Sequence, residues 1–100
     1  MIVYNETYLI DEDIHEQWLQ WIKANHVPAV LNTGTFSDSK ILKVLNSPNE
    51  GITYCVQFYT EDPAKYEDFM LYHLNPLSIA HNQAFENRFV VFNTLMQQLD

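Results

Sequence analysis

The side chains best suited to chemistry in this sequence are its histidines, and His26 comes first among them. It follows an amphipathic stretch and is predicted to lie at the C-terminus of a helix. A positive charge is stabilised there, typically by about 0.3–1 kcal/mol, so a purely structural role is sufficient. The alternative is a role as a general acid or base, which makes His26 a candidate site residue.

The other histidines do not predict a metal site. His73 and His81 are eight residues apart on one predicted helical stretch, a rise of about 12 Å, which is too far for one metal ion. They are predicted to border the core, although a break at Pro76 would change their geometry. Glu12 and His15 have the spacing of carboxylate-bridged metal sites, but such sites need matching ligands from several helices. We therefore predict a solvated face there, with no metal and no cofactor.

The single cysteine, Cys55, excludes an intrachain disulfide and is flanked by Tyr54 and Val56. A cysteine in such an apolar run is predicted to be a small buried hydrophobic residue that is chemically unreactive. Glycine occurs only at Gly34 and Gly51, so no phosphate-cradling loop is predicted.

The charge balance excludes two classes of partner. Thirteen Asp and Glu residues stand against five Lys and Arg, for a net charge of −8. Binding to nucleic acid needs clustered basic residues that displace counterions from phosphates, and binding to an anionic membrane is disfavoured for the same reason.

The N-terminus lacks the pattern of a signal peptide, and no apolar run approaches the roughly 20 residues of a membrane span. A cytoplasmic location is therefore expected.

The helices that must position these residues are predicted from apolar spacing and from proline. Apolar residues recur at helical spacing and form one face of the first predicted helix. They are Ile14, Trp18, Trp21 and Ile22. Pro28 is predicted to begin a short second helical piece that Gly34 ends in a left-handed conformation. Asp62 before Pro63 is typical of a helix start, and the pair Asn75-Pro76 is predicted to interrupt the helix that follows.

Strands are predicted over residues 2–9, 40–45, 52–59 and 89–95. The resulting order is strand, helix, strand, strand, helix, strand. It indicates a single α+β domain over residues 1–100, of the ferredoxin-like βαββαβ type, with a four-stranded antiparallel sheet and two helices on one face.

Both faces of this sheet are predicted to be apolar, which favours assembly. The helices are expected to cover Ile52, Tyr54, Val56 and Phe58, whereas the opposite face is predicted to carry Val3, Cys55, Tyr59, Phe89 and Val91. Large exposed apolar patches are uncommon, so we expect a homodimer through the sheet face that closes a dimeric α+β barrel. Its interior would hold a small-molecule ligand. The candidate ligand-binding residues in that cavity are Asn5, Thr7, Gln57 and Asn93.

Four segments of the chain resemble a family of short uncharacterised bacterial proteins. They are residues 2–5, 26–36, 53–57 and 89–95. That family is similar to the dimeric α+β barrel superfamily, whose members are ferredoxin-like and pair through their sheets. The resemblance implies the fold and no particular activity. Superfamily relatives include monooxygenases and cofactor-free isomerases that use polar residues near the barrel mouth, and some bind haem through a helix histidine. This sequence departs from the family pattern at Glu6, where an apolar residue is expected, and at Asn93, where arginine is expected.

Two hypotheses on function follow. The first is a non-catalytic dimeric module that binds a small molecule or a partner in the cavity between the sheets. The second is a cofactor-independent enzyme of the barrel type, monooxygenase-like or isomerase-like, that uses His26 as an acid or base. A convergent acid–base pair inside the cavity would favour the enzyme. The cavity residues named above are neutral amides and a hydroxyl, so the sequence favours the binding module.

Overall fold

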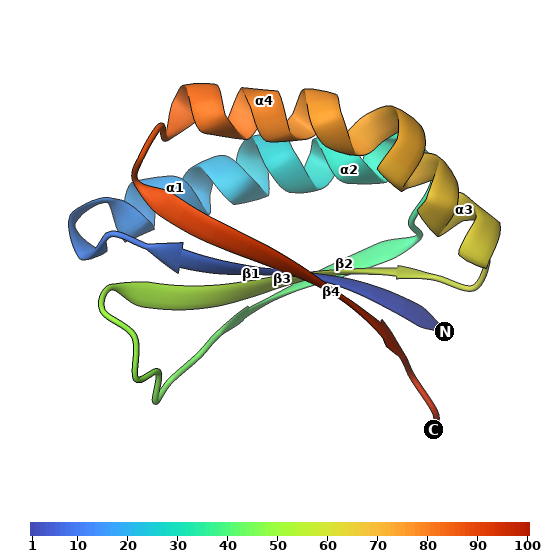
Figure 1. Cartoon of the computed structure of the whole chain (residues 1–100), viewed down its shortest axis with the longest axis horizontal. Coiled ribbons are helices and arrows are strands. Elements are labelled where there is room, and N and C mark those ends of the chain that lie inside the picture. Colours follow the sequence, from blue (N-terminus) through green and yellow to red (C-terminus); the bar gives the residue numbers. More distant parts are fainter.

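The computed structural model describes all 100 residues and contains one antiparallel sheet of four strands in the order β2-β3-β1-β4. The strands are β1 (Ile2–Ile10), β2 (Asp38–Lys43), β3 (Ile52–Thr60) and β4 (Phe89–Gln97). Figure 1 shows the helices lying side by side over one face of the sheet, while the other face is open. The predicted ferredoxin-like α+β fold is therefore confirmed. None of the helices combines the length and apolar character needed to cross a membrane.

The first helical layer is continuous from the short turn η1 (Glu12–Ile14) to the end of α2. It consists of α1 (His15–Trp21), the π-helical turn η2 (Ile22–His26) and α2 (Val27–Asn32). The predicted short helical piece with Pro28 in its first turn corresponds to α2, but it is continuous with α1 through η2 rather than separate from it. Proline is tolerated there since it follows directly on the wider π turn, in the first turn of α2. Gly34 does adopt the predicted left-handed conformation after the helix, with φ of +77°.

The π turn η2 explains how His26 enters the core. The buried residues of this helix are spaced by four, at Trp18, Ile22, His26 and Val30. In a regular α-helix with 3.6 residues per turn, each step of four rotates the side chain by about 40° further round the helix. The wider π turn, in which the Val27 N–H donates to the Ile22 carbonyl, offsets this drift and keeps all four on one face.

The second helical layer has the same construction. It consists of α3 (Pro63–Asp68), the π turn η3 (Phe69–His73) and α4 (Leu74–Ala84). The predicted interruption at Asn75-Pro76 is wrong, because the helix continues and Pro76 lies in the first turn of α4. The irregularity comes earlier, in η3, where the Leu74 N–H donates to the Phe69 carbonyl.

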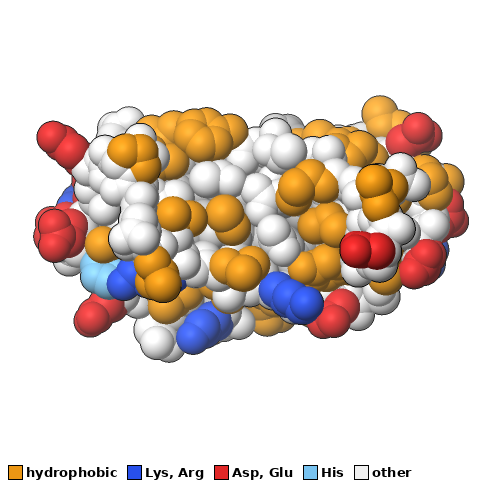
Figure 2. All heavy atoms as spheres, turned by 90° about the horizontal axis from the view of Figure 1, so that it is seen from below, with side chains coloured by type: hydrophobic (Ala, Val, Ile, Leu, Met, Phe, Trp, Pro, Cys, Tyr) orange, Lys and Arg blue, Asp and Glu red, His pale blue; other side chains and the backbone are white.

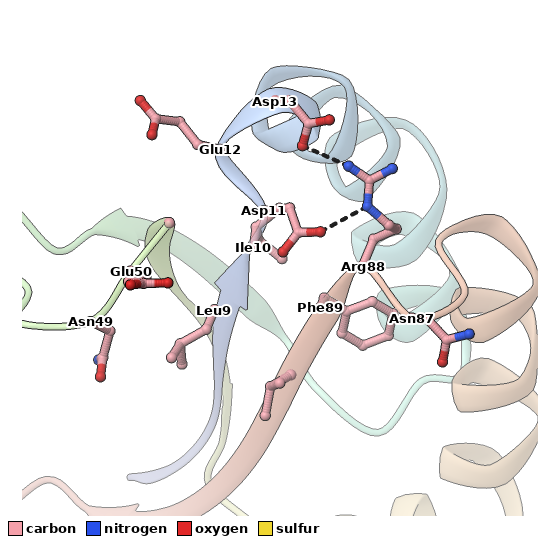
Figure 3. Close-up of a pocket in the computed structure, with 12 residues that line it drawn as sticks. Leu9, Ile10, Asp11, Glu12, Asp13, Asn49, Glu50, Asn87, Arg88 and Phe89 are labelled. Carbon is pink, nitrogen blue, oxygen red and sulfur yellow. Dashed lines mark hydrogen bonds and ion pairs between the residues drawn. The ribbon is translucent and has the colours of Figure 1, made fainter.

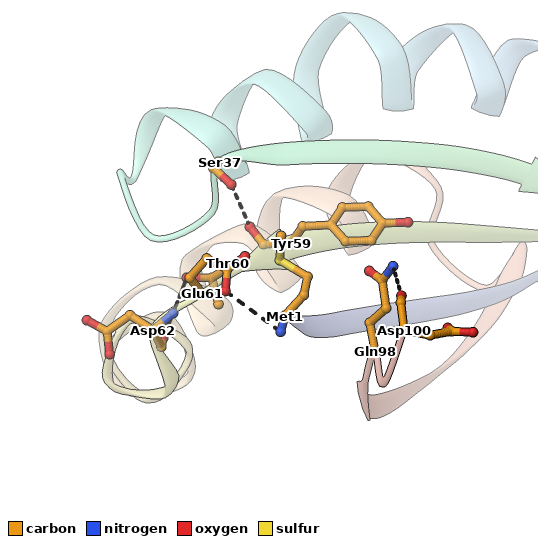
Figure 4. A network of polar contacts seen from close by, with 8 residues as sticks. All are labelled: Met1, Ser37, Tyr59, Thr60, Glu61, Asp62, Gln98 and Asp100. Carbon is orange, nitrogen blue, oxygen red and sulfur yellow. Dashed lines mark hydrogen bonds and ion pairs between the residues drawn. The ribbon is translucent and has the colours of Figure 1, made fainter.

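The end of the sheet near the start of α3 is held by short polar contacts (Figure 4). The Met1 ammonium lies 3.8 Å from the Glu61 carboxylate, and Ser37 Oγ donates to the Tyr59 carbonyl at 3.2 Å. Asp62 Oδ1 accepts the Ala64 N–H at 2.9 Å, which confirms the predicted helix start.

The register of β4 corrects the predicted faces of the sheet. Phe89 lies opposite Ile10, and Val91 lies opposite Tyr8. Directly opposed residues of an antiparallel pair point to the same face, so Phe89 and Val91 belong to the helix-covered face and not to the open one. The error arose because β4 is apolar on both of its faces, so alternation alone does not say which face is inward. Cys55 lies on the open face as predicted, but it is half-buried rather than buried.

Candidate functional site

Three of the predicted cavity residues meet on the open face of the sheet. Asn5 Nδ2 donates to Thr7 Oγ1 at 2.8 Å, and Gln57 Nε2 donates to Asn5 Oδ1 at 3.2 Å. Tyr59 Oη extends the chain by donating to Gln57 Oε1 at 2.8 Å, while Thr7 Oγ1 lies 3.7 Å from Cys55 Sγ. Their polar groups thus satisfy one another across β1 and β3. That they line a ligand cavity between two sheets stays a prediction.

The other two predicted residues lie on the opposite, helix-covered face. Asn93 is opposite Glu6 in the register of β1 and β4, so its placement with Asn5, Thr7 and Gln57 was wrong. His26 projects from the helical layer onto this same face, where its Nε2 lies 2.8 Å from Glu6 Oε1. The structure therefore divides the predicted set into an open-face group and a helix-side group.

The contact between Glu6 and His26 is almost completely closed to solvent. Each side chain is only 4% exposed. A carboxylate can only accept, so His26 Nε2 carries a proton and donates it to Glu6. His26 Nδ1 is buried without a hydrogen-bond partner. The second carboxylate oxygen, Oε2, accepts the Tyr4 hydroxyl at 3.2 Å.

Two buried tyrosines next to Glu6 stay neutral. Burial raises the pKa of both Tyr4 and Tyr8 well above the ordinary value, and the nearby Glu6 carboxylate raises each pKa further. The Tyr4 hydroxyl therefore acts as a donor to the carboxylate and does not compete with it as an acid. The Glu6 side chain is thus held by two hydrogen bonds, one from His26 and one from the neutral Tyr4 hydroxyl.

His81 on α4 completes the cluster. Trp18 Nε1 donates to His81 Nε2 at 2.9 Å, and the rings of His81 and His26 have their centroids 5.6 Å apart. Burial, and secondarily the positive charge that His26 would carry, lowers the pKa of His81 to about 3. His81 is therefore neutral near pH 7, and because its Nε2 accepts a hydrogen bond, its proton is on Nδ1.

A cavity of about 140 Å³ opens beside these groups, between α4 and the strands β1 and β4. We call it the helix-side pocket. Its polar lining consists of Glu6, Tyr8, His26, Ser78, His81, Asn82 and Asn93, and its apolar lining of Leu74, Leu77, Phe89 and Val91. A carboxylate that can accept a proton, a neutral imidazole that can donate a hydrogen bond and an apolar wall thus converge on one small space. This arrangement is suited to binding and deprotonating a small organic molecule.

A wider groove of about 850 Å³ at one end of the molecule has a different character (Figure 3). Arg88 pairs there with Asp11 at 2.7 Å and with Asp13 at 2.6 Å. These carboxylates raise the pKa of Arg88, and all three side chains are well exposed to solvent. The Asp11 N–H also donates to the Arg88 carbonyl, so the contacts fasten the end of β1 to the start of β4. We assign this groove a structural role.

Comparison with known proteins supplies a family. The family model described as "Domain of unknown function (DUF4286)" matches residues 1–99. The chain belongs to this family. No curated protein matches the sequence. The resemblance to an uncharacterised family that the sequence indicated is therefore confirmed, and the family carries no assigned activity.

Solved structures with the same fold are distant in sequence. HapK from Hahella chejuensis is 13% identical, with a TM-score of 0.71 over 99% of this chain and 93% of HapK. SnoaB, a cofactor-independent oxygenase from Streptomyces nogalater, is 10% identical, with a TM-score of 0.67 over 99% and 93% of the two chains. A dimeric ferredoxin-like protein from an uncultured marine organism is 13% identical, with a TM-score of 0.63 over 99% and 96%. At such identities the similarity establishes the fold alone.

The sequence analysis missed the roles of Glu6 and His81. In the sequence, Glu6 stood out only as a departure from an apolar pattern. That departure was the available signal of a buried polar contact, because an acid at a core-facing strand position needs a partner. His81 was expected to border the core, and nothing in its spacing from His73 points to a pocket. His73 itself is half-buried beside Phe69 and does not line the helix-side pocket. His15 was expected on a solvated face but is half-buried, with Nδ1 2.9 Å from the Tyr54 hydroxyl.

Proposed function

We propose that this protein is an enzyme that transfers a proton to or from a small organic molecule bound in the helix-side pocket. Glu6 is the general base, and His26 and Tyr4 position it. The observation that carries the proposal is the buried Glu6 carboxylate, held by hydrogen bonds from His26 and Tyr4 and lying at the wall of a cavity. The sequence favoured a non-catalytic module because it placed no acid–base pair in a cavity, whereas Glu6 and His26 form one.

Stability alone does not account for this arrangement. Removing a carboxylate from water costs several kcal/mol, and replacing a buried charged group by well-packed apolar residues is often neutral or stabilising. Buried ionisable groups beside a cavity are therefore candidates for function, since enzymes use such environments to tune proton transfer. The direct hydrogen bonds to Glu6 also fix its orientation, which a positioned base requires.

The size and lining of the pocket support a ligand class. A cavity of about 150 Å³ lined by apolar residues is large enough to bind benzene. The helix-side pocket, at about 140 Å³, therefore fits a ligand, or the reacting part of one, of about the size of a six-membered ring. Phe89 and Val91 provide apolar contact on the side of β4. The similarity in fold to SnoaB, a cofactor-independent oxygenase, is compatible with chemistry performed by side chains, although fold does not fix function.

Hydrogen exchange at carbon tests the proposal without knowledge of the natural substrate. Small carbon acids (ketones, nitriles and nitroalkanes) are incubated with the protein in D₂O, and replacement of C–H by C–D is followed by mass spectrometry. We expect acceleration for compounds that fit the pocket. Glu6→Gln should lower the rate by about 10²-fold or more, the usual contribution of a general base, because the amide keeps the volume but accepts no proton. The exposed Glu12→Gln is the matched control and should leave the rate unchanged. Equal rates for Glu6→Gln and the wild type would refute the proposal.

We also propose that two copies of the chain pair through the open face of the sheet. Figure 2 shows apolar side chains spread across this face among uncharged polar ones, with basic side chains toward its lower edge. Its most exposed apolar members are Leu42, Val90, Phe92 and Met96. Leaving such a surface in water forfeits roughly 25 cal/mol for each Å². The similarity to a dimeric ferredoxin-like protein supports the same assembly.

Light scattering after size exclusion tests the pairing. The wild type should have the mass of a dimer, and Phe92→Asp, which places a charge on the open face, should have the mass of a monomer. Leu71→Asp makes the same kind of change at a side chain that is 73% exposed on the helical side, and it should remain dimeric. A monomeric wild type, or a dimeric Phe92→Asp variant, would exclude this interface.

A further inference from the structure

His81 is the buried titratable group of the helix-side pocket that the proposed base does not need. It is 3% exposed, packs its ring on Phe89 at a centroid distance of 4.2 Å, and accepts the Trp18 indole N–H at Nε2. Each of these contacts restrains the ring. The Trp18 hydrogen bond also fixes the tautomer, because a neutral imidazole that accepts at Nε2 must carry its proton on Nδ1.

The Nδ1–H group of His81 has no acceptor in the protein. No hydrogen bond involves this atom. Among side-chain nitrogens and oxygens, only His26 Nδ1 is both closed off from solvent and without a partner, so His81 Nδ1 is not closed off. His81 Nδ1 therefore keeps access to open space, and the cavity that His81 lines is the helix-side pocket. Asn82 and Asn93 also line this pocket, but their amides can present either a donor or an acceptor and are exposed. His81 is the donor whose orientation is fixed.

We propose that His81 Nδ1–H binds the oxygen of a small carbonyl compound, and that an enolisable ketone or aldehyde is the substrate class of the pocket. This inference rests on the proposed function, with Glu6 as the base. It adds the second group that such chemistry requires, which is a donor aimed at the oxygen on which charge develops.

The step balances with the groups that the pocket contains. The bond between the α-carbon and its hydrogen breaks, and the proton goes to the Glu6 carboxylate. The electron pair of that bond forms the carbon–carbon double bond of the enolate, and the carbonyl oxygen takes up the negative charge facing His81 Nδ1–H. Return of a proton from Glu6 or solvent to carbon restores the carbonyl compound. A neutral imidazole is suited to this role because it stabilises the oxygen by donation without losing its own proton.

The test compares two ligands of the same shape, cyclohexanone and methylenecyclohexane, which differ in the oxygen that accepts the hydrogen bond. Binding is measured by NMR titration that follows the backbone N–H signals of Leu77, Ser78 and Asn82, which line the pocket and are unchanged in every variant. The wild type should bind cyclohexanone about tenfold more tightly, the value of one hydrogen bond that leaves no buried group unpaired. His81→Phe keeps an aromatic ring against Phe89 but removes the donor, and it should bind the two ligands equally.

A second variant separates recognition from folding. His81→Phe leaves the Trp18 indole N–H without a partner, so a control must separate loss of the donor from local disorder. The double variant Trp18→Phe/His81→Phe removes both partners of that hydrogen bond, so it leaves no unpaired indole N–H, and it should lack the preference just as His81→Phe does. Equal binding of the two ligands to the wild type would overturn the role of His81 as the donor to the carbonyl oxygen. It would not affect the proposal that Glu6 is the base of the pocket. Binding of neither ligand, together with no exchange in any carbon acid, would overturn the proposed function as well.

Discussion

Replacing His81 by phenylalanine should remove a specific part of the pH dependence of stability. His81 has a pKa of about 3 in the folded protein, lowered by burial and by His26, against an ordinary value of 6.5 when unfolded. Because the folded-state pKa is depressed, the unfolded chain binds more protons between these two values. Stability is therefore full above pH 6.5 and is lost as the pH falls toward 3. One pKa unit corresponds to about 1.4 kcal/mol.

The change in unfolding free energy can be calculated for a pH range in which the protein keeps a net negative charge. The isoelectric point is about 4.7, so pH 7.0 and pH 5.5 are suitable end points. Over this range the protonation of unfolded His81 should cost the wild type about 1.3 kcal/mol of unfolding free energy. Glu6, His26 and Tyr8 face His81 and remain in the variant, so the difference between the two pH slopes isolates His81.

Urea unfolding at the two pH values measures this difference. We expect the wild type to lose about 1.3 kcal/mol more than His81→Phe on acidification. His81→Phe should also be less stable at pH 7.0, by about 1–3 kcal/mol, because the Trp18 N–H loses its acceptor. Parallel pH slopes for the two proteins would show that His81 is protonated at similar pH in the folded and unfolded states, and would refute the buried neutral assignment.

Three further predictions concern single positions. Gly51→Ala should destabilise the protein by about 1–3 kcal/mol or more in urea unfolding, because Gly51 has φ of +77° and an added Cβ would collide with the Ile10 carbonyl; a variant as stable as the wild type would contradict this close approach. Asp62→Ala should cost about 1 kcal/mol in the same assay through loss of the cap of α3, whereas Asp62→Asn should retain most of it; equal losses would show that the cap bond is not the cause. Cys55 should react slowly with a thiol reagent in the dimer and rapidly in Phe92→Asp; equal rates in both would exclude burial of the open face.

The sequence predicted those parts of the fold that are encoded locally. Alternation in Ile52–Thr60, the Asp62-Pro63 helix start and the left-handed Gly34 each depend on a few neighbouring residues, and each occurs as predicted. The supposed helix break at Asn75-Pro76 did not occur. Proline was taken there as a boundary, but Pro76 lies in the first turn of α4, and the helix runs on from α3 through the π turn η3.

The candidate site was less accessible to sequence reasoning because its residues come from distant segments. Glu6 and His26 are 20 residues apart, and Trp18 and His81 are 63 residues apart, so neither contact leaves a spacing to recognise. Asn93 was assigned to the wrong face because an edge strand that is apolar on both sides has no inward signature. His26 was identified from the sequence as a candidate for acid–base chemistry. Its partner, Glu6, is known only from the structure, and it places the proposed chemistry on the helix-covered face.

A crystal structure with a bound carbon acid would test the central claim most directly, because two candidate sites lie on opposite faces of the sheet. A compound whose exchange the wild type accelerates is soaked into crystals of the catalytically silent Glu6→Gln variant. We predict electron density between α4 and strands β1 and β4, with the ligand oxygen within hydrogen-bond distance of His81 Nδ1. Density on the open face, against Asn5, Thr7 and Gln57, would contradict the account and would restore the cavity between two sheets as the functional site.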